Sequence, residues 1–323
     1  MNRIILLAAA TTFFWCGSVA QGQSQFTWKT DEAAGTSDLL YGDQVVIRYM
    51  FAYDDSTKDR ALETYKVYHH VYGPQSGERI TKGAGGKFTH HRGMFLGWNK
   101  TSFGDGKQYD FWHCKNGAHQ RHVKFLDQTA AADQGSMTAE IHWNDPDDNP
   151  VIIERRTVSV RKEPTSGGWQ IDWSSILESQ VGDIRLAGDR QHAGFQFRAD
   201  QAVADANGAT FLRPADFPQD AAAIQVGDKG DPPPHVNLNW FAETFKLNGN
   251  RYTVEYFDNP NLPKPALFSE RPYGRFGTYF ATTLTQSNPL ELKYRLVVTQ
   301  GESPSVDAIQ QRYDSFVGSL AKP

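Results

Sequence analysis

Hydrophobic and polar residues alternate along several short runs of the chain, and this alternation predicts β-strands. In residues 169–173, Trp169, Ile171 and Trp173 occupy every second position and therefore share one face of a strand. Similar runs predict strands at residues 45–50, 65–68, 151–160, 251–257 and 290–299. Turn-forming residues separate these runs at intervals of roughly 8–15 residues, which is typical of a β-sandwich or barrel.

Helical periodicity is confined to a small part of the chain. Apolar residues in 306–320 recur every three or four positions, and Pro304 just before them suits a helix start. A short helical turn is predicted at 201–206, and long loops at 76–87 and 228–234. No internal repeat or linker interrupts the pattern. The predicted fold is all-β: a single large antiparallel β-sandwich domain over residues 21–323, with a C-terminal helix.

The first twenty residues have the pattern of a secretory signal peptide. Arg3 supplies a positive charge, an apolar stretch covers residues 4–15, and Ser18-Val19-Ala20 is a small-x-small cleavage site. We therefore predict a signal peptide at 1–20 and a periplasmic or secreted protein. No later run reaches the length of about 20 apolar residues that a membrane span needs, so no integral membrane span is predicted.

Composition narrows the classes of partner. The 323 residues contain 33 Lys+Arg and 37 Asp+Glu, a net charge of −4, which gives no basic footprint for nucleic acid. Cleavage after Ala20 leaves Cys114 as the single cysteine, so no internal disulfide is expected. Aromatic residues make up 13% of the chain, and a few at a pocket rim would stack on a sugar ring. The partner we expect is a small-molecule or oligosaccharide substrate.

Histidine is the most informative residue type, because eight of the ten histidines fall between His69 and His142. Imidazole transfers protons near neutral pH and is a common metal ligand. His90 and His91 follow a glycine-rich segment, precede an apolar run, and are joined by Arg92. A second group is His192 with a strand in which Gln196 and Arg198 share one face.

A third polar group, residues 269–277, contains Glu270, Arg271 and Tyr273. Each group borders an apolar strand run, and we expect most of their side chains to converge on one pocket, with His119 or His122 nearby. The predicted catalytic residues are His90, His91, His192 and Glu270. The predicted substrate-binding residues are Arg92, Arg198, Gln196, Trp112, Arg271 and Tyr273.

A metal site is the alternative use of the histidines. His113, His119 and His122 lie within one short segment, and Asp110 is close in sequence. Their spacing matches no standard zinc motif, and no His-Glu-x-x-His is present. A divalent metal bound by this segment is the one cofactor that the sequence leaves open.

The polar groups together resemble a family of exported bacterial proteins of unknown function labelled PmoA-like, or "methane oxygenase PmoA". The matching motifs are His90-His91-Arg92-Gly93, Asp110-Phe111-Trp112-His113, Gln191-His192-Ala193-Gly194 and Ser269-Glu270-Arg271-Pro272-Tyr273. The chain departs from many members by having Asn259-Pro260 in place of His-Pro. The resemblance implies a β-sandwich related to carbohydrate chemistry. The order of the groups is also similar to that of the galactose-mutarotase-like supersandwich proteins, in which a histidine and a carboxylate move protons on a sugar.

Three functions follow from these observations. The first is an exported carbohydrate-active enzyme with proton-transfer chemistry, of lyase, epimerase or hydrolase type, in which one imidazole takes a proton and Arg92 or Arg198 stabilises an oxyanion. The second is a carbohydrate-binding β-sandwich without catalysis. The third is a metal-dependent enzyme that uses the 113–122 segment. The number of histidines and arginines exceeds what binding requires and favours an enzyme.

Overall fold

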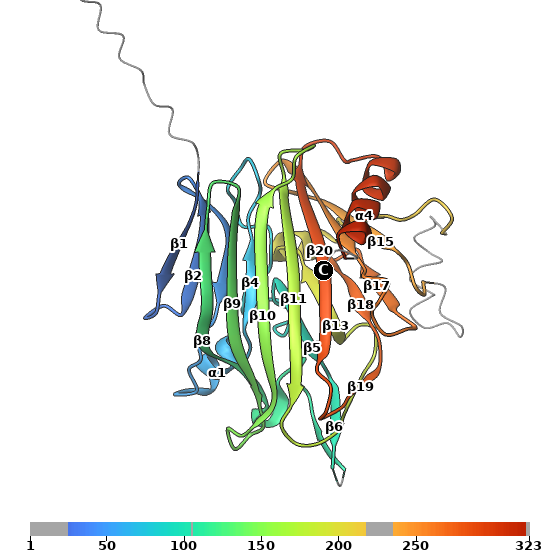
Figure 1. Ribbon diagram of the computed structural model, residues 1–323. Coiled ribbons are helices and arrows are strands. Elements are labelled where there is room, and N and C mark those ends of the chain that lie inside the picture. The colour runs from blue at the N-terminus through green and yellow to red at the C-terminus, as the bar shows by residue number, and fades with distance from the viewer. Residues whose placement is uncertain (1–24, 105, 218–234, 321–323) are drawn as a thin grey trace, which may run out of the picture.

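The computed structural model describes residues 25–104, 106–217 and 235–320, and most of its strands form two large antiparallel sheets that face each other (Figure 1). In spatial order, the first sheet consists of β1 (Phe26–Asp31), β2 (Thr36–Tyr41), β3 (Gln44–Met50), β4 (Tyr68–Val71), β5 (Met94–Trp98), β13 (Ala193–Arg198), β18 (Arg275–Tyr279) and β17 (Leu267–Arg271).

The second sheet is completed by the last strand of the chain. Its spatial order is β14 (Thr210–Leu212), β15 (Trp240–Leu247), β16 (Asn250–Phe257), β20 (Leu290–Gln300), β11 (Trp169–Ser179), β10 (Pro150–Lys162), β9 (Gln134–Asn144) and β8 (His119–Ala130). A smaller third sheet joins β19 (Thr282–Leu284), β12 (Ile184–Ala187), β6 (Lys100–Phe103) and β7 (Lys107–Tyr109).

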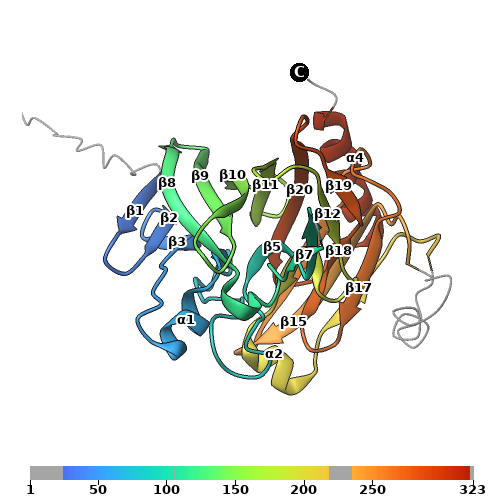
Figure 2. The same ribbon diagram turned by 90° about the horizontal axis from the view of Figure 1, so that it is seen from below.

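Short helical segments connect and cover the sheets. They are α1 (Lys58–Thr64), the 3₁₀ turn η1 (Lys115–Gly117), α2 (Gln201–Ala206) and α4 (Val306–Leu320). Figure 2 shows α4 on one side of the molecule and α1 and α2 on the other. Helix α4 buries Tyr313 and Phe316 against Phe257 of β16, and Gln310 accepts a hydrogen bond from the Trp240 indole at 2.8 Å. The helix therefore covers the outer face of the second sheet.

Burial along the strands shows which faces form the core. In β11, Trp169, Ile171 and Trp173 are buried and alternate with less buried residues, as the period-two pattern predicts. Strand β13 is buried on both faces instead. Its inner residue Phe195 stacks on Tyr294 of the second sheet, with ring centroids 4.8 Å apart. At β13 the outer face of the first sheet is therefore also covered, and loops cover it.

The all-β sandwich with a C-terminal helix is confirmed, as are the helices at 306–320 and 201–206. The strand expected at 65–68 begins only at Tyr68, because Lys66 before it turns its ammonium group onto loop carbonyls, including that of His90 at 3.1 Å. Residues 76–87 form a loop with isolated bridges. The predicted signal peptide at 1–20 and the predicted loop at 228–234 lie outside the described residues. Within the described part, no helix is long and apolar enough to cross a membrane.

Candidate functional site

Three histidines from three different loops meet over the outer face of the first sheet. His90 lies between β4 and β5, His113 between β7 and η1, and His192 between β12 and β13. The ring centroid of His113 lies 4.7 Å from that of His90 and 4.8 Å from that of His192. The ring centroids of His90 and His192 are 5.8 Å apart. Among the described residues, this is the one group of His, Cys, Asp or Glu with three ligand atoms within 4.8 Å of one another.

Backbone contacts fix two of these loops at the end of β5. The amide of Phe111 donates to the carbonyl oxygen of Trp98 at 3.0 Å, and the amide of Asn99 donates to that of His192 at 3.2 Å. A Cβ atom at Gly97 would lie 2.5 Å from the carbonyl oxygen of Phe111. Only glycine therefore allows the loop to pack so closely on the strand.

Two of the histidines are each oriented by an aspartate that lies three residues earlier in the chain. The Nδ1 atom of His113 lies 2.7 Å from Oδ2 of Asp110, and Nδ1 of His192 lies 3.0 Å from Oδ1 of Asp189. A carboxylate accepts hydrogen bonds, so Nδ1 carries the proton in each ring and the Nε2 lone pair is free. Carboxylates hold metal-binding histidines in proteins in the same way.

The third imidazole has a ring nitrogen without a protein partner. Nε2 of His90 is buried and makes no hydrogen bond, an arrangement that costs free energy unless a ligand satisfies it. Burial, with smaller effects from Lys66 and His113, lowers the pKa of His90 to about 2. The imidazole is therefore neutral at physiological pH, and the neutral form is the one that binds a metal ion.

The donor set fits a divalent transition metal. Zinc binds imidazole nitrogen at about 2.0–2.1 Å in tetrahedral geometry, which places its ligand atoms roughly 3.4 Å apart. The ligand atoms are up to 4.8 Å apart, so they would need to approach one another by at most about 1.4 Å. Three protein ligands with a fourth position left open are typical of catalytic zinc, whereas structural zinc has four protein ligands.

Two hollows border the three histidines. His113 lines one of about 440 Å³ together with Tyr53 and Tyr65. His192 lines another of about 440 Å³ together with Arg190 and Tyr279. A small molecule in either hollow would therefore lie beside a histidine of the group.

A buried lysine links two of the loops that form the site. Lys66 is 2% exposed and donates from Nζ to the carbonyl oxygens of His90, at 3.1 Å, and Trp112. Burial lowers the pKa of Lys66 to about 7. Because it joins the backbones of two site loops, Lys66 fixes the position of His90 relative to that of His113.

Several predicted residues surround the three histidines. The ring of His91 lies 4.6 Å from that of His90 and stacks on Phe88 at 5.0 Å and on Tyr273 at 5.9 Å. Burial, followed by the charge of Arg198, keeps the pKa of His91 well below its usual value. His91 is therefore uncharged and belongs to an aromatic wall of the site.

The predicted substrate-binding residues have different surroundings. Arg198 lies over the Trp112 ring at 5.4 Å and donates from Nη1 to Oε1 of Gln196 at 2.9 Å. Arg92 instead donates to the backbone carbonyls of Thr89, His91 and Leu62. Arg92 therefore holds the loop that carries His90, and the structure gives it no position beside the three histidines.

Glu270 does not join the histidines. Its carboxylate pairs with the buried guanidinium of Arg213. Neighbouring residues of a strand point to opposite faces, so Glu270 and Arg271 of β17 cannot both face the site. Burial raises the pKa of Glu270 to about 7, partly offset by Arg213. The predicted catalytic carboxylate is thus placed on the inner side of the sheet.

The predicted metal set of His113, His119 and His122 does not converge either. Nδ1 of His119 lies 2.9 Å from the carbonyl oxygen of Gly117, and its Nε2 lies 3.0 Å from Asp148. The His122 ring packs on Phe125, with centroids 4.6 Å apart. Both histidines are on β8 of the second sheet, whereas His113 precedes η1 and faces the first sheet. His113 and His119 line the same hollow, but the three side chains do not bring their ligand atoms together as a metal site requires.

Sequence reasoning missed Asp189 and Lys66, and it noted Asp110 only as a carboxylate close to the 113–122 segment. A signal for the two aspartates is visible, because Asp110-x-x-His113 and Asp189-x-x-His192 repeat the same spacing. Lys66 has no comparable signal, since its burial depends on the packing of two distant loops.

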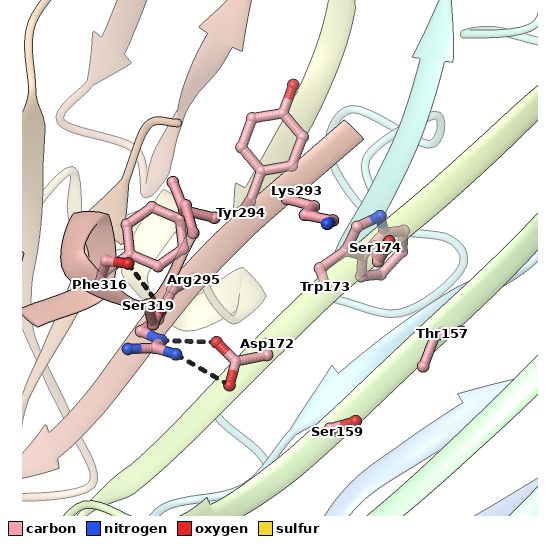
Figure 3. A pocket seen from close by; sticks show the side chains of 11 residues that line it. Thr157, Ser159, Asp172, Trp173, Ser174, Lys293, Tyr294, Arg295, Phe316 and Ser319 are labelled. Carbon is pink, nitrogen blue, oxygen red and sulfur yellow. Dashed lines mark hydrogen bonds and ion pairs between the residues drawn. The ribbon is translucent and has the colours of Figure 1, made fainter. Parts of the chain in front are cut away.

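A cavity of about 230 Å³ lies elsewhere, between the second sheet and α4 (Figure 3). Asp172 and Arg295 in its wall pair with each other, with Arg295 Nε 2.5 Å from Asp172 Oδ1. Phe316 of α4 and Trp173 of β11 supply apolar surface. Its carboxylate and guanidinium are thus already satisfied, and we place the functional site at the three histidines.

Comparison with known proteins identifies a family without naming an activity. Residues 36–314 match a family described as "Family of unknown function (DUF6807)". No curated protein matches the chain. The label PmoA-like does not occur in the matched description, so that resemblance stays a prediction.

Solved structures similar to this chain include proteins of carbohydrate metabolism. A galactose mutarotase related enzyme from Lactobacillus acidophilus is 7% identical, with a TM-score of 0.36, over 87% of this chain and 98% of that one. An α-galactosidase variant from Geobacillus stearothermophilus is 8% identical, with a TM-score of 0.36, over 86% of this chain. The heparan sulfate lyase HepC from Pedobacter heparinus is 8% identical, with a TM-score of 0.33, over 84% of this chain. The match covers 40% of the galactosidase and 36% of the lyase.

Proposed function

The chain belongs to this family of unknown function, and we propose that it is a metal-dependent enzyme whose divalent ion is bound by His90, His113 and His192. One observation carries the proposal: three imidazoles from three separate loops bring a ring nitrogen each within 4.8 Å of one another. Asp110 and Asp189 orient two of the rings, and this support would serve no purpose for freely exposed histidines.

The residues around the three histidines support catalysis. A divalent ion in such a site polarises a substrate oxygen or lowers the pKa of a water molecule. Asp110 and Asp189 keep the Nδ1 proton in place, which leaves Nε2 directed at the ion. Lys66 holds two of the loops together, so the ligands are positioned before the ion binds.

For the substrate we propose a sugar or glycoside. The aromatic wall of Phe88, His91 and Tyr273 offers ring faces for stacking, and Arg198 and Gln196 offer polar groups nearby. The choice also rests on the family resemblance described above. A metal-independent proton transfer by His90 or His91 is less well supported, because both imidazoles are buried and uncharged near neutral pH.

Metal analysis of the purified protein tests the proposal. The protein, prepared without chelator, should contain about one equivalent of a divalent transition metal, measured by plasma mass spectrometry. His90→Ala, His113→Ala and His192→Ala should each lose most of it. His142→Ala is the matched control, since His142 lies on β9 of the second sheet and pairs with Glu140.

The competing results are distinct. Metal loss in His119→Ala or His122→Ala, with His90→Ala unchanged, would favour the 113–122 segment. Absence of bound metal after incubation with Zn²⁺, Mn²⁺ and Co²⁺ would overturn the proposal. A metal-loaded protein that binds sugars without turning any over would favour the carbohydrate-binding function.

A further inference from the structure

Three arginines lie side by side across three adjacent strands of the first sheet. The strand register pairs Arg198 of β13 with Arg275 of β18, and Arg275 with Arg271 of β17. Directly opposed residues of antiparallel strands point to the same face, with Cβ atoms about 4.5–5.5 Å apart.

Nearby carboxylates do not form an ion pair with Arg198. Asp189 binds His192, and Glu270 binds Arg213. Glu243 is fully buried, and neither of its carboxyl oxygens has a hydrogen-bond partner. It therefore does not neutralise Arg198 through an ion pair. Burial also raises the pKa of Glu243 well above its usual value, which favours the uncharged acid.

Arg198 has one edge of its guanidinium without a partner. Nη1 donates to Oε1 of Gln196 and to the carbonyl oxygen of Phe197, both at 2.9 Å. Nε and Nη2 have no hydrogen-bond partner, although Arg198 is only 1% exposed. Leaving two charged donors buried and unsatisfied costs free energy unless a ligand accepts from them.

The same edge binds a carboxylate in four other arginines of this protein. In each of them, Nε and Nη2 donate to the two oxygens of one acidic side chain. These pairs are Arg48–Asp38, Arg156–Glu154, Arg295–Asp172 and Arg312–Glu255. Two parallel donors match the two oxygens of a carboxylate. The open edge of Arg198 therefore has the geometry of a carboxylate site that lacks its carboxylate.

Arg198 is close to the three histidines. Its guanidinium lies 5.4 Å from the centre of the Trp112 ring, and that ring is 6.3 Å from the ring of His192. Its charge is also among those that lower the pKa of His90 and His91. A molecule bound at this edge is therefore within reach of the proposed metal ion.

We propose that the substrate carries a carboxylate group, as a uronic acid or its glycoside does, and that the Nε–Nη2 edge of Arg198 binds this carboxylate. This inference rests on the proposed function, because it assigns the substrate class of the same site. Since Arg198 is 1% exposed, the surrounding loops move when the carboxylate enters.

Matched sugars test the inference. D-glucuronate and D-glucose differ at C6, where a carboxylate replaces a hydroxymethyl group. Binding is measured by isothermal titration calorimetry and thermal shift, with metal-loaded protein and again after EDTA treatment. The wild-type protein should bind glucuronate at least tenfold more tightly than glucose in both forms. Arg198→Met should remove the preference, and Arg198→Lys should weaken it because lysine lacks the two-donor edge.

Arg155→Met is the control, because Arg155 pairs with Glu178 on the second sheet, away from the site. It should bind as the wild type does. Equal or no binding of the two sugars, or an unchanged preference in a folded Arg198→Met variant, would overturn the inference. So would equal binding of D-glucose 6-phosphate, which would show an unselective anion site. A preference lost with EDTA would assign the carboxylate to the metal instead. A protein that binds no metal yet prefers glucuronate would contradict only the proposed function.

Discussion

The Nδ1 atom of His192 forms a hydrogen bond of 3.0 Å with a carboxylate oxygen of Asp189, which lies three residues earlier in the chain. His113 and Asp110 have the same spacing and form the same hydrogen bond, at 2.7 Å. In both loops the same aspartate also accepts a backbone amide hydrogen bond, at 2.9 Å and 3.0 Å. The direction of each imidazole is therefore set by its own loop. Two loops that are distant in sequence use one local design to present a nitrogen to a common point.

Removing either aspartate should weaken metal binding and leave the fold intact. Asp110→Ala and Asp189→Ala each lose the acceptor that fixes Nδ1, and such changes typically reduce metal affinity about 10–100-fold. Competition titration with a chromophoric chelator measures the effect. Asp148→Ala serves as the comparison, because Asp148 contacts His119 outside the group. Unchanged affinity in both site variants would show that the aspartates do not support a metal.

Asp258 should make stability depend on pH. Burial raises its pKa from 3.8 to about 6, although Lys264 lies 2.9 Å away. The folded state then holds the proton more tightly than the unfolded state, so this stabilisation is present below pH 3.8 and disappears as the pH rises through about 6. Asp258→Asn stays neutral throughout.

Relative to wild type, the unfolding free energy of Asp258→Asn should therefore rise between about pH 4 and about pH 7.5, by on the order of 3 kcal/mol. Urea unfolding at the two pH values measures the difference. Asp127→Asn, an exposed position on β8, should show no such trend. A variant that becomes relatively less stable with rising pH would contradict the expected sign.

The buried pair of Glu154 and Arg156 should be essential to the second sheet. Both side chains are fully buried, and Glu154 also accepts hydrogen bonds from Trp143 at 2.9 Å and Ser175 at 2.5 Å. Glu154→Met leaves the guanidinium unpaired and should cost about 3–5 kcal/mol of unfolding free energy.

Replacing both Glu154 and Arg156 by Met should recover much of this loss, since no buried charge then remains unpaired. Chemical denaturation of the single and double variants measures the difference between them. A single variant that loses less than about 1 kcal/mol would show that the guanidinium finds another partner.

Export is tested at the N-terminus. Cleavage after Ala20 predicts a mature protein that begins at Gln21. Intact-mass measurement of the protein secreted by a host with its natural leader shows where processing occurs. A mass that includes residues 1–20 would contradict the proposed periplasmic or secreted location.

The fold was predictable where the signal is local. The alternation of Trp169, Ile171 and Trp173 and the helical spacing at 306–320 depend on near neighbours, and both appear in the structure as predicted. The pairing of β5 with β13 is different, because it joins segments far apart in the chain. No short-range pattern encodes such pairing, and this pairing brings His192 next to His90.

The candidate site also has a part that the sequence predicts and a part that it does not. His90 and His192 are recognisable as polar residues at the ends of apolar strands, and the structure brings them together. The sequence pattern predicts His119 and His122 as partners of His113, but these two residues lie on β8, and the ligand atom of His113 lies near those of His90 and His192 instead. Glu270 and Arg271 are adjacent on one strand, so the pleat separates their side chains, and this consequence was available from the sequence.

The position of β20 has a consequence for how the protein is made. This strand of 11 residues lies between β16 and β11, and without it the second sheet falls into two pieces with open edges. A chain leaving the ribosome cannot close these edges until its last strand has emerged. Unpaired edges promote association with other chains, so the unfinished second sheet is exposed to aggregation until β20 pairs with β16 and β11. A chain that ends before β20 would therefore keep two unpaired strand edges, those of β16 and β11.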